Sequence, residues 1–389
     1  MVVGIVAEYN PFHNGHKLQI EYAKKVLHAS HVVVAMSGPF TQRGEIACFD
    51  KYVRAHAALL SGADIVLEIP TIFATASAKE YASAAVQLLA STGIVDTLLF
   101  SAEYDDADLF KSSAKLLVTL ENNGQLDKEI NTYMQSGCTF AAARSKALEK
   151  HLPTALISNP NSILGIEYCR YIEKNNINMD VAVLKRQNND YRDDNLTGEI
   201  SSATSIRNNM SSTGEIKAVP ENCLDIYKEA TYMDADDVSQ LLHFKLITEQ
   251  DFERYLDCTG DLADRIRNNV NNFVSFTQFC QLLKTKNITY TRISRVLCHI
   301  LLNITSADFE EAKANGYISY LRMLGFSKYG VTLLGDIKKK ASLQLITSPT
   351  EDIHPCDIFA SDIYRIICTN KKKEVIPNEY TRKFNLTNI

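Results

Sequence analysis

Two histidines three residues apart, His13 and His16, follow a predicted strand and open a predicted helix. Residues 2–7 form a short apolar run rich in β-branched residues, which indicates a buried strand. Pro11 cannot donate a backbone hydrogen bond to a sheet and predicts a turn. The pattern that follows is helical through Lys25. A helix start exposes unpaired N–H groups and the positive end of a dipole, so we expect this corner to bind phosphate beside two imidazoles.

A second group of residues suited to phosphate lies at Ser202, Thr204 and Arg207. The two hydroxyls cap a predicted helix and can donate to phosphate oxygens, while Arg207 adds a fixed positive charge one turn later. Alone this pattern is weak, because Ser and Thr before a helix are ordinary caps. It gains weight because it follows the fifth predicted strand of the same chain.

Predicted strands and helices alternate through the first half of the chain. Strands separated by helices imply βαβ units and a parallel, doubly wound, Rossmann-like α/β sheet. In that fold ligands bind beyond the carboxyl ends of the strands. The predicted strands lie at 2–7, 31–36, 63–69, 97–100 and 181–184, and the segments that follow them are the expected binding loops.

The alternation stops near residue 220. From about residue 230 the pattern is helical, and no long β run is expected before 344–347. We therefore predict an α/β domain over residues 1–215 and a mainly helical domain over 216–389.

Composition excludes several classes of protein. No apolar run is long enough to span a bilayer, and the first strand lacks the basic segment of a signal peptide, so no membrane partner is expected. Nine cysteines without a C-x-x-C disfavour a disulfide framework and a zinc site, and they indicate a cytoplasmic protein.

The net charge of −5 is unevenly distributed along the chain. Residues 1–210 hold 19 basic and 23 acidic residues, 211–283 hold 6 and 13, and 284–389 hold 16 and 10. The last segment includes the lysine runs 338–340 and 371–373. This asymmetry hints at a polyanionic partner for the C-terminal end, although solvated helix faces explain the charge equally well.

The H-x-G-H element resembles the signature of the HIGH-motif nucleotidyltransferases, and the longer string EYNPFHNGH resembles the bacterial tRNA(Met) cytidine acetate ligase family. The S-S-T-x-I-R and M-S-G-x-F-x-x-R-G-E elements of these families are matched around Arg207 and Arg43. Three positions depart from the family pattern: Ser101 replaces a glycine, Ser162 an asparagine and Ala203 a serine.

The resemblance implies an enzyme that uses ATP and Mg²⁺ to activate acetate as acetyl-adenylate. The acetyl group would then pass to N4 of the wobble cytidine in elongator tRNA(Met), with RNA rather than DNA as the nucleic acid. The resemblance implies that residues 1–215 are the ATP-binding catalytic domain and that the helical domain over 216–389 binds the tRNA. The implied catalytic residues are His13, His16 and Arg207. The implied ATP-binding residues are Ala7, Glu8, Tyr9, Asn10, Pro11, Phe12, His13, Asn14, Gly15, His16, Ser101, Asn161, Arg186, Ser202 and Thr204.

Several alternatives remain open from the residues alone. Asn161 also reads as a plain helix cap, and Arg43 as an exposed arginine of a surface loop. The whole chain also fits a metabolite adenylyltransferase, or an RNA-binding protein without catalysis on the same fold.

Overall fold

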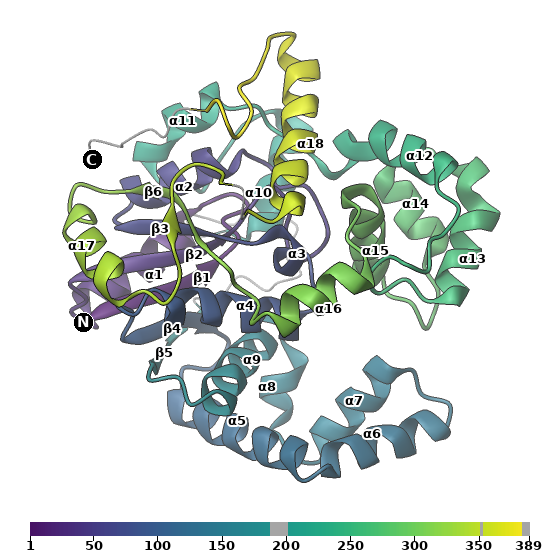
Figure 1. Cartoon of the computed structure of the whole chain (residues 1–389), viewed down its shortest axis with the longest axis horizontal. Helices are drawn as coiled ribbons and strands as arrows, with labels where there is room; N and C mark the ends of the chain where they lie inside the picture. Colours follow the sequence, from purple (N-terminus) through teal and green to yellow (C-terminus); the bar gives the residue numbers. More distant parts are fainter. Residues whose placement is uncertain (187–200, 351–352, 383–389) are drawn as a thin grey trace.

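The residues that the computed structural model describes, 1–186, 201–350 and 353–382, form a seven-stranded sheet with helices on both faces (Figure 1). Its strand order is β5-β4-β1-β2-β3-β6-β7. Strands β1 to β5 are parallel, as predicted, and β6 is antiparallel to β3. The strands are β1 Val2–Ala7, β2 His31–Ser37, β3 Ile65–Ile69, β4 Thr97–Ala102, β5 Asp180–Lys185, β6 Leu321–Phe326 and β7 Leu345–Ile346.

Helices connect the parallel strands and form most of the C-terminal part. Within the described part of the chain, no helix is long and apolar enough to cross a membrane. The α-helices are α1 Asn14–Lys25, α2 Lys51–Leu60, α3 Thr71–Ala74, α4 Ala78–Ser91, α5 Ala107–Asn122, α6 Gln125–Gln135, α7 Phe140–Glu149, α8 Thr154–Ser158, α9 Pro160–Lys174, α10 Ala203–Thr213, α11 Leu224–Glu229, α12 Ser239–Thr248, α13 Gly260–Asn269, α14 Phe276–Leu283, α15 Tyr290–Leu302, α16 Ser306–Ala314, α17 Val331–Lys340 and α18 Pro355–Lys372.

The two faces of the sheet carry different hydrophobic cores. Side chains alternate between the faces along each strand. Val3 and Val34 pack with α1 and α2 on one face, whereas Val33 and Ala35 pack with α4 on the other. Burial on both faces explains why the parallel strands read as nearly continuous apolar runs.

Strand β6 was not predicted, and the expectation of a helical pattern up to residue 344 is wrong at this point. Its sequence, Leu-Arg-Met-Leu-Gly-Phe, contains residues that favour helices. Tertiary packing overrides that preference, because β6 closes the free edge of β3 and also packs on α2. A Cβ at Gly325 would lie 2.8 Å from Leu59 Cδ1, so the small residue lets the strand approach α2 closely.

The chain after residue 215 is divided between two places. Helices α12 to α15 lie together beside the sheet (Figure 1), and their core is continuous with the core on the α4 face. By contrast α11 packs into the opposite core, and β6, α17 and β7 extend the sheet. The division at 215/216 stays a prediction about folding units, and part of the expected helical domain is built into the sheet.

Candidate functional site

A cavity of about 430 Å³ lies beyond the carboxyl ends of β1, β4 and β5. The adjacent strands β1 and β4 lie at the point where the strand order reverses. The chain passes from β1 to β2 on one side of this point and from β4 to β5 on the other side, so a crevice opens between β1 and β4. The lining comes from the turn after β1, the loop 41–45 after β2, the end of β4, the start of α9, and the segments around β5 and α10. The ligand-binding edge predicted from the sequence coincides with this cavity.

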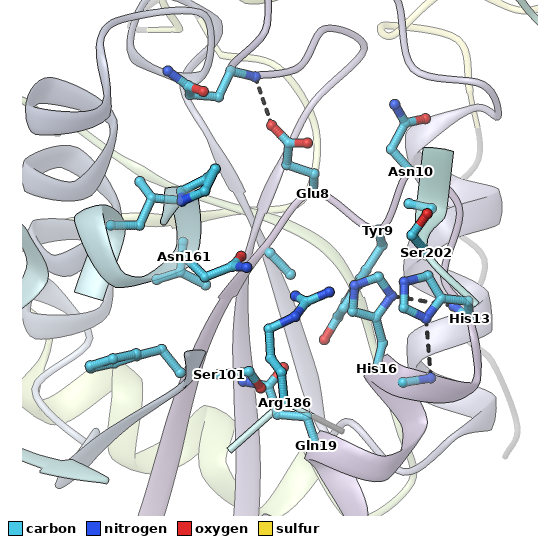
Figure 2. Close-up of a pocket in the computed structure, with 18 of the residues that line it drawn as sticks. Glu8, Tyr9, Asn10, His13, His16, Gln19, Ser101, Asn161, Arg186 and Ser202 are labelled. Carbon is cyan, nitrogen blue, oxygen red and sulfur yellow. Dashed lines mark hydrogen bonds between the residues drawn. The ribbon is translucent and has the colours of Figure 1, made fainter. Parts of the chain in front are cut away.

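The two histidines form a reciprocal cap at the start of α1. The backbone N–H of Gly15 donates to His13 Nδ1 at 3.1 Å, and the backbone N–H of His13 donates to His16 Nδ1 at 3.2 Å. The two imidazole rings stack with centroids 3.7 Å apart (Figure 2). This cap fixes the direction of both rings toward the cavity that they line.

The same hydrogen bonds set the protonation of the rings. Because each Nδ1 accepts a hydrogen bond, the single proton of each neutral ring lies on Nε2. Burial, with the nearby charges of Arg186 and Arg207, lowers the pKa of His13 to about 3. Burial, His13 and Arg186 lower the pKa of His16 well below its usual value. At neutral pH the pair therefore presents two uncharged Nε2–H donors.

Two arginines bring positive charge to the histidine pair. Arg186 follows β5 and extends toward the rings (Figure 2). Arg207, in the second turn of α10, donates to the backbone carbonyl of Asn10 at 2.6 Å, which ties α10 to the turn after β1. The hydroxyl of Ser202 caps α10, accepting from Ser205 N at 3.1 Å. The helix N-terminus and the arginines together favour an anion at this end of the cavity.

Asn161 is not a helix cap. It lies inside the first turn of α9, and its side chain donates to Glu103 Oε1 at 2.9 Å. Ser162 donates to the second oxygen of the same carboxylate at 2.7 Å. Burial would raise the pKa of Glu103, but these two hydrogen bonds, a backbone hydrogen bond and the charge of Arg186 together outweigh burial and lower the pKa. The three residues hold the end of β4 against α9, so Asn161 faces the cavity from a fixed position.

Most of the site residues predicted from the sequence line this one cavity. They are Ala7, Glu8, Tyr9, Asn10, His13, Gly15, His16, Ser101, Asn161, Arg186, Ser202, Thr204 and Arg207.

Three predicted residues lie outside the lining and support the turn instead. Phe12 is fully buried, and its carbonyl accepts from Tyr227 OH at 3.1 Å. The backbone N–H of Asn14 donates to the carbonyl of Ala218 at 3.1 Å. Pro11 is buried beside them. These contacts anchor the turn between β1 and α1 to the chain that leads into α11.

Several polar lining residues were not predicted from the sequence. Gln19 donates to the carbonyl of Leu99 at 3.2 Å, so it joins α1 to β4 at the cavity floor. Gln42 and Glu45 belong to the loop after β2, of which only Arg43 had been singled out. The sequence feature that could have identified them is their position in the segment that follows a parallel strand.

Arg54 positions the loops that form one wall of the cavity. Its guanidinium is completely buried and donates to the backbone carbonyls of Glu8 and Ser37 at 2.5 and 3.1 Å. It also donates to the carbonyls of Phe49 and Gly38. One side chain therefore ties together the carboxyl ends of β1 and β2.

Known proteins resemble this chain over nearly its whole length. The family model described as HIGH Nucleotidyl Transferase matches residues 1–378. The tRNA(Met) cytidine acetate ligase of Clostridium perfringens is 32% identical over 387 residues, which cover 94% of this chain and 95% of the relative. The protein of that name in Thermosipho africanus is 35% identical over 362 residues, covering 90% of this chain and 85% of the relative.

Solved structures agree with this similarity. Thermotoga maritima TmcAL bound with alpha-thio ATP has a TM-score of 0.84 at 29% identity and is matched over 94% of each chain. The apo form of the same protein has a TM-score of 0.86, over 98% of this chain and 97% of that one. The chain therefore belongs to the tRNA(Met) cytidine acetate ligase family, within the HIGH nucleotidyl transferases.

Proposed function

We propose that this protein is an ATP-dependent ligase that makes acetyl-adenylate from acetate and ATP, releases pyrophosphate, and acetylates N4 of the wobble cytidine of elongator tRNA(Met). The observation that carries the proposal is the pair of neutral Nε2–H donors held over the cavity by the His13–His16 cap. The names of the relatives supply acetate and the tRNA, and the analogue bound to the Thermotoga maritima protein supports ATP.

In the first step, a carboxylate oxygen of acetate attacks the α-phosphorus of ATP. The bond from that phosphorus to the bridging oxygen breaks, and pyrophosphate leaves with the electron pair. The protein contributes mainly by positioning and by stabilising charge on the phosphate oxygens. His13 and His16 donate to the α-phosphate through Nε2, while Arg207, Ser202 and Thr204 hold the leaving pyrophosphate.

Neutral histidines suit this role. An imidazolium would hold the phosphate of substrate and product strongly, whereas a neutral N–H donor strengthens as charge develops in the transition state. Arg186, at the end of β5, adds a further fixed positive charge.

Mg²⁺ enters this proposal as part of the nucleotide. Mg²⁺ usually binds through substrate phosphates, waters and one or two carboxylates rather than in a cage of protein ligands. Among the residues that the structure describes, no group of three or more His, Cys, Asp or Glu side chains forms a metal site. Bound in this way, Mg²⁺ would offset the charge of the departing pyrophosphate.

Exchange of labelled pyrophosphate into ATP tests the first step. We expect exchange with acetate and none without it. Exchange that needs a phosphorylated metabolite instead of acetate would favour the metabolite adenylyltransferase. A chain that binds RNA but supports no exchange would be a non-catalytic binding protein.

Mass spectrometry of N4-acetylcytidine in elongator tRNA(Met) tests the second step. The same tRNA with the wobble cytidine replaced by uridine is the matched control, because it removes the amine and keeps the rest of the RNA.

A further inference from the structure

The acetyl transfer needs a proton acceptor. The lone pair of the cytosine amine is delocalised into the ring, so the amine is a weak nucleophile. A base that removes one N4 proton as the N–C bond forms would lower this barrier, typically by about 10²–10⁴-fold in rate. AMP leaves with the electron pair of the broken C–O bond. The question is which group of the cavity receives the proton.

The histidines of the cavity are unsuited to accept it. Each Nδ1 already accepts a backbone hydrogen bond, and each Nε2 carries a proton. Tyr9, Tyr81 and Tyr168 also line the cavity, but burial raises their pKa, so all three phenols stay protonated. The arginines of the cavity and the ammonium of Lys185 carry only donors. The carboxylates of Glu8 and Glu45 remain.

The two carboxylates differ in their hydrogen bonds. Glu8 Oε1 accepts from the backbone N–H of Gln42 at 2.8 Å, so one of its carboxylate oxygens is already engaged as an acceptor. The carboxylate of Glu45 receives no hydrogen bond and forms no salt bridge with any residue in the described ranges. Burial raises the pKa of Glu45 above its ordinary 4.5, against the opposing charges of Arg207 and Arg43 and with the support of Glu8.

We propose that Glu45 is the general base of the transfer step, accepting the N4 proton of the cytidine while the amine nitrogen bonds to the acetyl carbon and AMP departs. This inference rests on the proposed function and adds a residue to it. A cavity carboxylate whose oxygens accept no hydrogen bond from the described residues can accept one from the amine. A raised pKa makes it a stronger base than an ordinary glutamate.

The loop that carries Glu45 is held rigidly. Its first and last residues pair, since Thr41 N donates to the Glu45 carbonyl at 3.0 Å. Gly44 has φ +75°, and a Cβ there would lie 2.5 Å from Arg295 Cα, so the loop rests directly on the backbone of α15. Ser294 Oγ also donates to the Gly44 carbonyl at 3.3 Å. The backbone that carries Glu45 is therefore held in place by contact with α15.

The groups that face Glu45 come from its own loop and from four other parts of the chain. Arg207 lies on α10, Arg43 in the same loop, and Glu8 after β1. Cys280 on α14 and Tyr290 on α15 also interact with the Glu45 charge, and burial keeps both of them protonated. Across the neutral range the only one of these neighbours that shares the carboxylate's sign is Glu8.

The test separates the two chemical steps in the full-length protein. With preformed acetyl-adenylate and tRNA(Met), Glu45→Gln should lower the single-turnover rate of acetyl transfer by about 10²–10⁴-fold. Its acetate-dependent pyrophosphate exchange should fall far less, and its affinity for tRNA should be that of the parent. Glu45→Asp should recover part of the transfer rate. Glu8→Gln is the matched control, and we expect it to reduce transfer less than Glu45→Gln does.

The pH profile supplies a readout that a structural role would not move. The transfer rate of the parent should rise with pH through a pKa above 4.5, as Glu45 loses its proton, and Glu45→Gln should remove that limb. Transfer at the parental rate by Glu45→Gln would overturn the inference. Equal losses of exchange and transfer, above all if excess Mg²⁺ restores both, would make Glu45 part of the ATP site. A parent without acetate-dependent exchange would instead refute the proposed function.

Discussion

At the scale of residues, the histidine pair combines two roles that substitution can separate. His13 Nδ1 caps α1, while its Nε2–H faces the cavity. Asparagine places an acceptor where Nδ1 lies and is itself a good cap, but it has no counterpart of Nε2. The first turn of α1 can therefore survive the loss of the phosphate donor.

We predict that at neutral pH His13→Asn keeps the parental stability and lowers acetate-dependent pyrophosphate exchange by about 10²–10³-fold, the usual effect of losing one transition-state donor. His13→Ala should lose the same activity and also about 1 kcal/mol of stability, because it removes the cap. Urea unfolding and exchange assays on both variants check this. Parental exchange by His13→Asn would leave His13 with a structural role only.

The lowered pKa of the same residue predicts how stability depends on pH. Between about 3 and 6.5 the unfolded chain binds a proton at His13 that the folded chain does not bind. This contribution to stability is complete above pH 6.5 and is lost as the pH falls, by about 1.4 kcal/mol per unit for one proton. Urea unfolding at a series of pH values gives the free energy of unfolding as a function of pH. Over this pH range its slope against pH should be shallower for His13→Asn than for the parent by about this amount. Identical slopes would show that His13 titrates normally in the fold.

At the scale of elements, local pattern decided what could be predicted. The strand, turn and helix around the histidines are adjacent in sequence, so their spacing predicted them. The Ser202 cap of α10 is also local, but its pattern gained weight only from the predicted strand before it. The hydrogen-bond partner of Asn161 is Glu103, which is 58 residues away in the sequence, and no local sequence pattern predicts such a contact. Strand β6 was not predicted for the same reason, because its strand conformation depends on pairing with β3, which is distant in the sequence.

Arg54 offers a test of how firmly the loops after β1 and β2 are held. Lysine keeps the charge but cannot span the four carbonyls that the guanidinium fork reaches. Arg54→Lys should lower the free energy of unfolding by about 1–3 kcal/mol or more, because buried carbonyls lose their hydrogen-bond donor. It should also weaken ATP binding. Urea unfolding and calorimetric titration with ATP measure both effects. Arg365→Lys, at a partly exposed arginine of α18, is the control and should change neither.

At the scale of the whole molecule, the two lysine runs prove to be different. Lys338, Lys339 and Lys340 are exposed at the end of α17, and no salt bridge within the described residues involves them. Lys371 instead pairs with Asp237 and donates to the carbonyl of Tyr232 at 3.0 Å, which joins α18 to the segment before α12. Of the two runs, the one on α17 is the better placed to meet RNA phosphates.

We therefore predict that replacing residues 338–340 with alanine weakens tRNA binding and flattens its salt dependence. The log–log slope should fall by nearly one unit for each RNA phosphate that these lysines neutralise in the parent. Acetate-dependent pyrophosphate exchange should persist, because the cavity lies elsewhere. The same replacement at 371–373 should lower stability more than tRNA affinity. Filter binding over a salt series shows which of the two lysine runs contacts the tRNA. If the log–log slope of tRNA affinity against salt is unchanged in both variants, the lysines are a solvated surface.

Strand β6 has a consequence for synthesis on the ribosome. The polypeptide emerges from its N-terminus, so β1 to β5 are available long before residues 321–326. Throughout that interval β3 is the outer strand of an unfinished sheet, with unpaired N–H and C=O groups that invite pairing with another chain. A nascent protein released early, by a premature stop or by ribosome stalling, would keep that edge open. Such fragments should aggregate or depend on chaperones, even when they contain every residue of the ATP cavity.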